Sequence, residues 1–307
     1  HDPSAYNADL DKMLNRVFMG DKEVIQFFDE MVGYMLIKHA RYRAGFMLFG
    51  GGRNGKSTIL DLLKRFIGSR NHATIELEKL TDRFSTAELE HKLANIGDDI
   101  NHVTLKNTGT LKKLFTGESL QVERKGERPF TMQPYAKMIF AMNELPHSYD
   151  KSEGFYSRLM FIPFNARFTP EDADFDPNIA DKIMTEEGLS YLLNRAILGA
   201  QRLMKRGGFS RPKSVEDMLQ GYKERNSVAL SWLSEEEHDL EYVLGTAVDD
   251  IYGDFTDWCK RSGVYGREIP GKVMFNRELR DHFGLESGTA QRRDGKDRRR
   301  FFTISLD

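Results

Sequence analysis

The chain has 307 residues, of which 39% are hydrophobic and 30% charged, a balance typical of a globular protein with room for more than one domain. Its formal net charge is −2, so any contact with nucleic acid must come from local basic patches. Cys259 is the sole cysteine, which excludes an internal disulfide and a cysteine-cluster zinc site and favours a reducing, intracellular compartment.

The chain starts with HDPSAYNADL, which lacks a Met and any signal-peptide pattern. We therefore expect a chain cut from a longer polypeptide, or one that carries a tag scar. Apolar residues between Tyr6 and His39 recur at helical spacing on both sides of Gly20-Asp21, which predicts two helices. No apolar run approaches the roughly 20 residues that a membrane span needs, so we expect no membrane partner.

A short apolar run, Ala44–Phe49, ends in glycines and predicts a buried strand. The apolar spacing that follows predicts a helix that ends at Gly68. Ser85 and Glu88 form the sequence pattern of a capping box for a short helix. Further buried strands are expected at LANIGDDI, at Lys137–Met142 and at Arg158–Phe164. Strands that alternate with helices predict an α/β fold with a parallel sheet.

The C-terminal third has a different pattern. Residues from Pro170 to Trp232 have helical spacing, and the composition shifts after SEEEHDLEY. Two further helices are predicted by apolar stripes, one from Ile251 to Trp258 and one around Phe275 and Leu279. The last residues, RRDGKDRRRFFTISL, predict a hairpin with a basic turn.

Residues 50–57 read GGGRNGKS and match the phosphate-binding pattern G-x-x-x-x-G-K-[ST] in full. Glycines let backbone N–H groups surround phosphate oxygens, and the following helix points its positive end at the same anion. The alternative, a glycine-rich turn that binds nothing, is disfavoured by the strand–loop–helix context. We expect ATP and Mg²⁺ as cofactors, with these nucleotide-binding residues: Gly50, Gly51, Gly52, Arg53, Asn54, Gly55, Lys56, Ser57 and Thr58.

An ATPase of this kind needs an acid on a neighbouring strand to hold Mg²⁺ and usually a second acid to orient water. Asp98 and Asp99 follow an apolar strand and supply such a pair, and a solvated Asp-Asp turn is the alternative. Asn143 ends the strand at 137–142, where its amide can bond the γ-phosphate or the attacking water; a simple turn residue is its alternative.

Two basic features follow. Residues 122–130 predict strand, turn and strand, with Lys125-Gly126 at the tip and Arg124 and Arg128 beside it. These cations can contact nucleic-acid phosphates, or they can form a solubilising surface. Arg158 precedes a strand and can act as an arginine finger supplied to a neighbouring subunit, whereas an ordinary surface arginine is the alternative.

Taken together, the motifs resemble the superfamily-three helicases, and within them the helicase half of phage and plasmid primase–helicases. The resemblance covers almost the whole chain and is carried by GGGRNGKST, LANIGDDI, LKKLFTGESLQVERKGERPFTMQPYAKMIFAMNELP and GFYSRLMFIPF. It implies an AAA+-like ring, a hexamer, with ATP at each subunit junction. Lys56, Ser57, Asp98, Asp99 and Asn143 would act in cis, Arg158 would act in trans, and Lys125 with Arg124 would line the pore. Many relatives have Glu in the acidic motif, so which aspartate holds Mg²⁺ together with Ser57 stays open, although we assign Asp98.

The resemblance also implies a domain layout. Residues 1–40 correspond to an N-terminal helical collar, 41–168 to the P-loop ATPase core, 169–233 to a helical subdomain and 234–307 to a winged-helix-like DNA-binding domain. In the last of these, VMFNRELRDHFG would be the recognition-type helix and RRDGKDRRRFF the wing. A flexible, solvated turn is the alternative for the wing. Its cations are dense enough to grip DNA phosphates, and the predicted contacts are Arg292, Arg293, Arg298, Arg299 and Arg300.

These inferences predict an ATP-dependent replicative DNA helicase of a phage, plasmid or mobile element, active in the cytoplasm of a bacterial host. Its partners would be single-stranded DNA, fork or origin duplex and further copies of the chain; a loader or inhibitor protein is left open. No primer synthesis is expected from this chain. An ATP-switched initiator that melts or marks an origin is the alternative. A small-molecule kinase is disfavoured because no second-substrate pattern is present.

Overall fold

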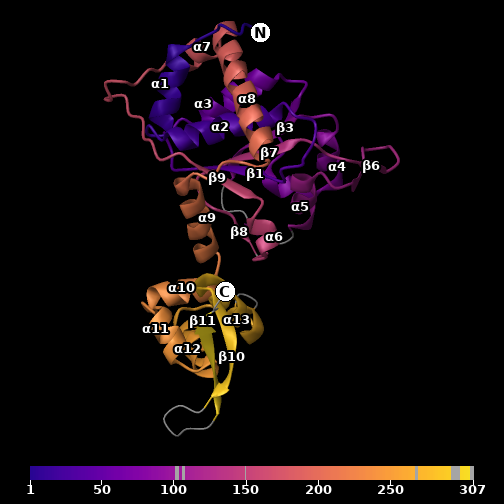
Figure 1. Ribbon diagram of the computed structural model, residues 1–307. Coiled ribbons are helices and arrows are strands. Elements are labelled where there is room, and N and C mark those ends of the chain that lie inside the picture. The colour runs from indigo at the N-terminus through magenta and orange to yellow at the C-terminus, as the bar shows by residue number, and fades with distance from the viewer. Residues whose placement is uncertain (101–103, 106–107, 149, 267–268, 292–297, 305–307) are drawn as a thin grey trace. The chain divides into compact units, whose positions relative to one another are not determined.

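The computed structural model describes residues 1–100, 104–105, 108–148, 150–266, 269–291 and 298–304 (Figure 1). Within these ranges the chain divides into two compact units, residues 1–220 and 221–307. Each unit buries a hydrophobic cluster of its own. The first unit takes in the predicted collar, the predicted ATPase core and most of the predicted helical subdomain.

The described strands of the first unit include a parallel five-stranded sheet. Its order is β2 (His72–Ala73), β3 (Ala94–Ile100), β7 (Lys137–Met142), β1 (Gly45–Phe49) and β9 (Leu159–Pro163). All six residues of β7 are buried, which explains why its sequence reads as a continuous run and not as an alternation. The predicted α/β class with a parallel sheet is confirmed.

The two predicted N-terminal helices are α1 (Ala8–Val17) and α2 (Lys22–Met35), and the helix after the glycine loop is α3 (Lys56–Ile67). Side chains cap the first two. The Asn7 Oδ1 atom accepts a hydrogen bond from the Leu10 backbone N–H at 2.7 Å, and Asp21 caps α2 in the same way. The apolar faces of α1, α2 and α3 pack into one cluster with β1 and β7.

Helix α8 (Glu186–Arg206) packs closely against α2. This close approach requires glycine in the contact: a Cβ atom on Gly33 would lie 2.3 Å from the Ala196 carbonyl oxygen. Glu30, fully buried in α2, accepts hydrogen bonds from the Arg206 guanidinium at 2.9 Å and from the Ser210 backbone N–H at 2.8 Å. The segment after the sheet is therefore fixed onto the N-terminal helices.

Shorter elements complete the first unit. They are η1 (Leu77–Thr81), α4 (Arg83–Thr86), η2 (Ala87–Leu89), β4 (Thr104–Leu105), α5 (Gly109–Thr116), β5 (Leu120–Val122), β6 (Phe130–Met132), β8 (His147–Ser148), α6 (Glu153–Tyr156) and α7 (Ile179–Ile183). The predicted capping box is wrong: Asp82, not Ser85, caps α4, through a 2.9 Å hydrogen bond from the Phe84 backbone N–H.

Helix α9 (Lys213–Arg225) contains the boundary between the units. The second unit then has α10 (Val228–Glu235), α11 (Leu240–Gly245), α12 (Val248–Arg261), α13 (Lys272–Phe283), β10 (Leu285–Gln291) and β11 (Arg299–Ile304). Its core is aromatic: the rings of Phe255 and Phe275 stack with centroids 4.5 Å apart, and both lie against Trp232. The two predicted helices are confirmed as α12 and α13. An antiparallel pair is also present near the C-terminus, but β10 precedes the segment in which the hairpin was predicted, and residues 292–297 of the predicted basic turn lie outside the described residues. Among the described residues, no helix is long and apolar enough to cross a bilayer.

Candidate nucleotide site

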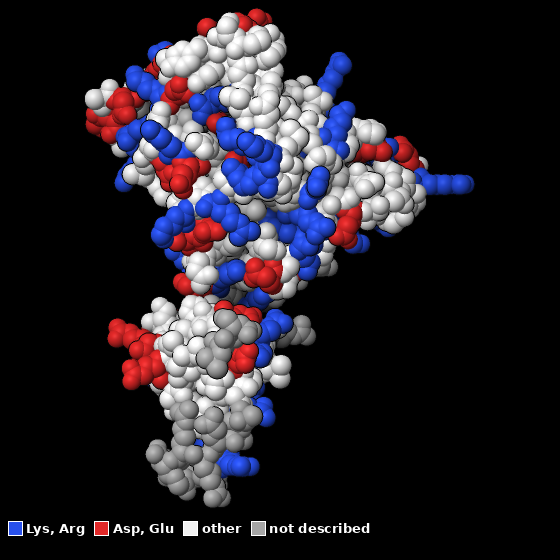
Figure 2. All heavy atoms as spheres, in the orientation of Figure 1, with Lys and Arg blue, Asp and Glu red and all other residues white. Residues whose placement is uncertain are grey.

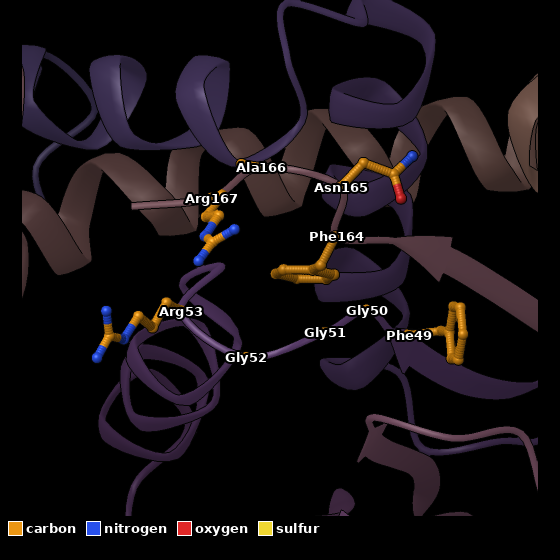
Figure 3. A pocket seen from close by; sticks show the side chains of 9 residues that line it. All are labelled: Phe49, Gly50, Gly51, Gly52, Arg53, Phe164, Asn165, Ala166 and Arg167. Atoms are coloured by element: carbon orange, nitrogen blue, oxygen red, sulfur yellow. The ribbon is translucent and has the colours of Figure 1, made fainter. Parts of the chain in front are cut away.

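The glycine loop joins the carboxyl end of β1 to the first turn of α3 (Figure 3). Gly55 has φ +85°, a left-handed conformation that favours glycine. A Cβ atom at Gly50 would lie 2.2 Å from the Phe164 carbonyl oxygen, so this position tolerates no side chain. The loop is thus held closely against the chain that leaves β9.

Lys56 is 8% exposed and its ammonium group lies inside the loop. The Nζ atom donates to the Gly51 carbonyl at 3.0 Å and to the Asn143 Oδ1 atom at 3.0 Å. The carbonyl of Gly50 and the Asn54 side chain also accept from it. Two predicted site residues, Lys56 at the start of α3 and Asn143 after β7, are therefore in direct contact.

Asn54 has a structural part that the sequence motif does not reveal. Its buried amide donates to the Phe164 carbonyl at 3.1 Å, and its Oδ1 atom accepts from the Lys56 backbone N–H at 3.3 Å. One side chain thereby braces the loop on two sides. The motif allows any residue at this position. The sequence therefore predicts Asn54 as a nucleotide contact but does not predict its hydrogen bonds to Phe164 and Lys56.

The acidic pair lies at the same edge of the sheet. The register between β3 and β7 shifts between Gly97 and Ile100, which forms a bulge at Asp98 and Asp99. Bulges redirect side chains and recur beside active sites. The Asp98 side chain is exposed; that of Asp99 lies outside what the structure describes. Because β7 separates β3 from β1, the pair is displaced from the β1 strand by two strand spacings, about 10 Å.

These residues fit a magnesium-bound triphosphate. Among the described side chains, no three His, Cys, Asp or Glu residues converge into a metal cluster. Mg²⁺ typically takes one or two carboxylates, waters and substrate phosphates instead. The exposed hydroxyl of Ser57 and a carboxylate of the bulge supply such a sparse set of ligands.

Arg158 lies at the opposite edge of the sheet. Its carbonyl accepts a 2.8 Å hydrogen bond from the Gly45 backbone N–H, at the start of β1. The loop begins after the five residues of β1, about 16 Å further along the strand. The Nε atom of Arg158 is buried and makes no hydrogen bond to the residues that the structure describes. The structure does not bring Arg158 to the Lys56 site of its own chain.

The predicted DNA-contacting residues on the hairpin of β5 and β6 differ in their surroundings. Arg124 forms an ion pair with Glu90 and lies over the Phe130 ring, with its guanidinium carbon 4.9 Å from the ring centroid. Lys125 and Arg128 are exposed and form no ion pair with the described residues. In Figure 2, basic side chains project beyond this hairpin. Arg124 therefore braces the hairpin, whereas its neighbours face outward.

In the second unit, Arg298, Arg299 and Arg300 are exposed at the start of β11. Arg299 pairs with Asp250 of α12. Arg292 and Arg293 lie outside the described residues. Of the predicted basic turn, only its C-terminal flank can thus be located.

A hollow of about 610 Å³ lies beside the glycine loop, and Figure 3 shows the residues that line it. Arg53 and Arg167 both line it, and both are exposed. The Arg53 backbone is left-handed, with φ +58°, which is uncommon outside glycine and clusters at functional sites. Arg167 follows β9 with no motif around it, so nothing in the sequence indicated that it borders the loop.

The phosphate loop, Asn143 and Arg158 fall within the part of the chain that matches a protein-family model. That model, described as a family of unknown function (DUF5906), matches residues 48–158, just over a third of the chain.

Two curated relatives are viral. The chain is 23% identical over 262 residues to a "Putative helicase" of Acanthamoeba polyphaga mimivirus, covering 77% of this chain and 26% of that protein. It is 21% identical over 310 residues to a "Putative helicase" of Invertebrate iridescent virus 3, covering 89% and 32%. The chain thus spans between about a quarter and a third of the length of these relatives.

The fold is also that of a known structure. An apo structure of the C-terminal region of NrS-1 matches with a TM-score of 0.63 at 15% sequence identity, over 97% of this chain and 77% of that one. A second apo structure of the same region matches with a TM-score of 0.62. At this identity the likeness concerns the fold.

Proposed function

We propose that the chain is the motor part of an ATP-dependent DNA helicase that works as a ring, a hexamer, in the replication of a phage, plasmid or other mobile element. The observation that carries the proposal is the contact between Lys56 and Asn143. It joins a full phosphate-loop motif to the end of the adjacent strand, where a group that monitors the γ-phosphate belongs. The similarity to two viral proteins named as helicases supports the same function.

Each residue at this edge would have a defined task. Lys56 would exchange its carbonyl and amide acceptors for β- and γ-phosphate oxygens. Asn143, released from Lys56, would then bond the γ-phosphate or the attacking water. Ser57 and Asp98 would hold Mg²⁺, which supplies charge neutralisation at the β- and γ-oxygens when bound. The second aspartate of the bulge would orient the water.

Arg158 would complete the site of a neighbouring subunit. Its distance along the sheet from its own phosphate loop excludes direct action there, and its buried Nε atom makes no hydrogen bond to the described residues. An arginine that reaches a neighbour's γ-phosphate stabilises the charge of the transition state. Hydrolysis would then require assembly, which links the ATP site to ring formation.

DNA would be contacted by two surfaces. Lys125 at the hairpin tip would follow a phosphate through the ring, while Arg124 holds the hairpin to Glu90. In the second unit, Arg298 and Arg300 would grip duplex phosphates. Exposed acidic residues at the end of α10, at the start of α11 and between these helices would repel DNA there; they are Glu235, Glu236, Asp239 and Glu241.

The second candidate is an ATP-switched initiator that binds or melts an origin without continuous unwinding. The ion pair that fixes Arg124 favours it, because a braced hairpin can wedge DNA without moving along it. Turnover separates the two functions: a switch binds ATP and hydrolyses little of it when DNA is present, whereas a motor hydrolyses faster.

The deciding experiment measures ATP hydrolysis with and without single-stranded DNA, fork unwinding, and molar mass with an ATP analogue. Lys125→Ala should abolish unwinding and leave basal hydrolysis. Arg124→Ala is the matched comparison, since it loosens the hairpin but keeps the tip cation, and should reduce unwinding only in part. Full unwinding by Lys125→Ala would contradict the tip's role, and absent hydrolysis by the wild type with DNA would contradict the motor.

A further inference from the structure

The chain segments that leave β3 and β7 come together again beyond the nucleotide edge of the sheet. In chain order, β3 with its acidic bulge is followed by β4, and β7 with Asn143 is followed by β8. Strands β4 and β8 pair in parallel, with Leu105 opposite Ser148. Ser148 is fully buried, so the rest of the first unit covers this pair. The segments that follow the acidic bulge and Asn143 are therefore joined to each other.

Asp150 lies two residues after β8. Its backbone N–H donates to the Ser148 Oγ atom at 3.1 Å, which fixes it to the end of that strand. Burial alone would raise the pKa of Asp150, but the hydrogen bonds that its side chain accepts, chiefly from Lys112, hold that pKa below its usual range. The carboxylate is therefore charged throughout the neutral pH range.

The two oxygens of this carboxylate hold two different helices, α5 and α6, which are labelled in Figure 1. The Oδ2 atom accepts from the Lys112 Nζ atom at 2.7 Å and from the Thr108 hydroxyl, at the start of α5. The Oδ1 atom accepts from the backbone N–H of Ser152, the N-cap of α6, at 3.0 Å. Hydrogen bonds to an ionised group are about twice as strong as neutral ones. Asp150 thus connects α5, α6 and the segment that follows Asn143.

Both helices lead to residues that have a part in the proposed function. Helix α5 ends at Gly117, whose left-handed backbone directs the chain into β5 of the hairpin. Helix α6 leads to Arg158, whose backbone N–H donates to the Phe155 carbonyl at 3.1 Å. A Cβ atom on Gly154 would lie 3.4 Å from the Arg158 Nη1 atom, so the guanidinium lies beside α6.

We propose that Asp150 is a positioning residue that passes the state of the nucleotide at Asn143 to the hairpin, through α5, and to Arg158, through α6. The inference rests on the proposed function, because it needs Asn143 to leave Lys56 when ATP binds. Asn143 and Asp150 lie seven positions apart, and β8 between them is held by β4. A shift of Asn143 has little slack chain to absorb it before it reaches Asp150.

The branch at Asp150 implies a form of regulation between subunits. Under the proposed function, Arg158 serves the ATP site of a neighbour, whereas Asn143 senses the ATP of its own subunit. One carboxylate would then connect the ATP site of a subunit both to its own DNA contact and to the next ATP site. We therefore expect hydrolysis at neighbouring sites to be cooperative, with the same residue needed for coupling to DNA.

The first test measures coupling between nucleotide and DNA in the whole chain. Fluorescence anisotropy gives the affinity for a labelled oligothymidylate with and without a non-hydrolysable ATP analogue and Mg²⁺. The analogue should change this affinity in the wild type. Lys112→Met removes one arm and keeps the Ser152 hydrogen bond. It should lose at least about fivefold of the coupling, the lower end of the usual range between sites, and bind the analogue alone as the wild type does.

The second test separates the two arms. Asp150→Ala removes both, so it should lose the coupling to DNA and also lower the Hill coefficient of ATP hydrolysis toward about 1. Lys112→Met should keep the Hill coefficient of the wild type, because the link to α6 is intact. A purely structural loss would lower the free energy of unfolding without separating these two readouts. If Asp150→Ala does not fold, the DNA coupling of Lys112→Met still decides.

Asp217→Asn is the matched control, because Asp217 accepts a hydrogen bond from Lys213 at 2.6 Å on the exposed side of α9. It should match the wild type in both tests. Wild-type coupling in folded Lys112→Met, or an unchanged Hill coefficient in folded Asp150→Ala, would overturn the role of Asp150. A wild type that binds analogue and DNA without coupling would overturn it too, while the ATP site would stand. A wild type that binds no analogue would overturn the proposed function itself.

Discussion

Two lysines are buried at opposite edges of one parallel sheet, and their surroundings differ in kind. Lys56, at the carboxyl edge, is surrounded by oxygens of the glycine loop and of Asn143. Lys137, at the amino edge, is 1% exposed; its Nζ atom donates to the carbonyls of Ile37 and Tyr135 and lies 4.6 Å from the centroid of the Tyr34 ring.

The difference teaches that burial of a cation does not identify an active site. The acceptors of Lys56 belong to a loop whose geometry depends on glycine, and under the proposed function phosphate oxygens would replace them. Those of Lys137 are fixed by the end of α2 and the start of β7. Burial lowers the pKa of Lys137 to about 7 without giving it access to a substrate. What separates the two is whether the partners can be exchanged.

The largest expected effect is on ATP hydrolysis, and it tests the difference between the two lysines directly. Lys56→Ala should reduce ATP hydrolysis below detection, because the charge that faces the β- and γ-phosphates is lost. Lys137→Met is the matched control and should keep DNA-stimulated hydrolysis per folded molecule. A steady-state assay with circular dichroism measures both. Equal loss of hydrolysis in two folded variants would refute the distinction.

Arg158→Ala should slow hydrolysis about a thousandfold while ATP still binds, as expected of an arginine finger. Mixing it with Lys56→Ala subunits should restore part of the activity, because some junctions then join an intact loop to an intact Arg158. Arg211→Ala, an exposed arginine paired with Glu216, should behave as wild type. An absence of rescue at every mixing ratio would count against action in trans.

A smaller effect concerns the carboxyl edge alone. Gly50→Ala should lower the free energy of unfolding by about 1–3 kcal/mol, the usual cost of overpacking, since its Cβ would meet the Phe164 carbonyl. Gly52→Ala, with nothing within 4 Å of the added Cβ, should leave stability unchanged. Urea unfolding distinguishes them, and equal midpoints would contradict the close packing of the loop.

The smallest effect is the pH dependence at the amino edge. Between about pH 7 and its ordinary pKa of 10.5, the Lys137 side chain is mostly protonated in the unfolded chain and mostly neutral in the native chain. Stability from this residue therefore rises with pH across that window, by at most about 1.4 kcal/mol per pH unit. The stability of the wild type relative to Lys137→Met should increase between neutral and alkaline pH; a constant or falling difference would disprove the shift.

The sheet was largely predictable because its strands are buried on both faces. The run KMIFAM predicts a strand at Lys137–Met142, and β7 has those bounds. Local hydrogen bonds were harder to infer. Ser85 and Glu88 have the spacing of a capping box. The N-cap of the short helix is nevertheless Asp82, whose side chain accepts a hydrogen bond from the Phe84 backbone N–H. Two plausible caps three residues apart look alike in sequence.

The candidate site divides in the same way. The loop motif predicted its lysine, and strand ends predicted Asn143, because parallel strands bring their carboxyl ends to one edge. The sequence could not reveal that Glu90 fixes Arg124, since the two lie 34 positions apart. Nor could it reveal that Lys112 and Asp150 form a pair, because no periodicity connects segments so distant.

Strand β7 also has a mechanical consequence. The strand runs from Lys137 to Met142, the residue before Asn143. At its start, Lys137 donates a hydrogen bond to the Ile37 carbonyl just after α2; beyond its end, Asn143 accepts one from Lys56. The strand acts as a strut of about 20 Å between the N-terminal helices and the phosphate loop. A displacement of α2 along this axis must break a hydrogen bond at one end or be transmitted to the other.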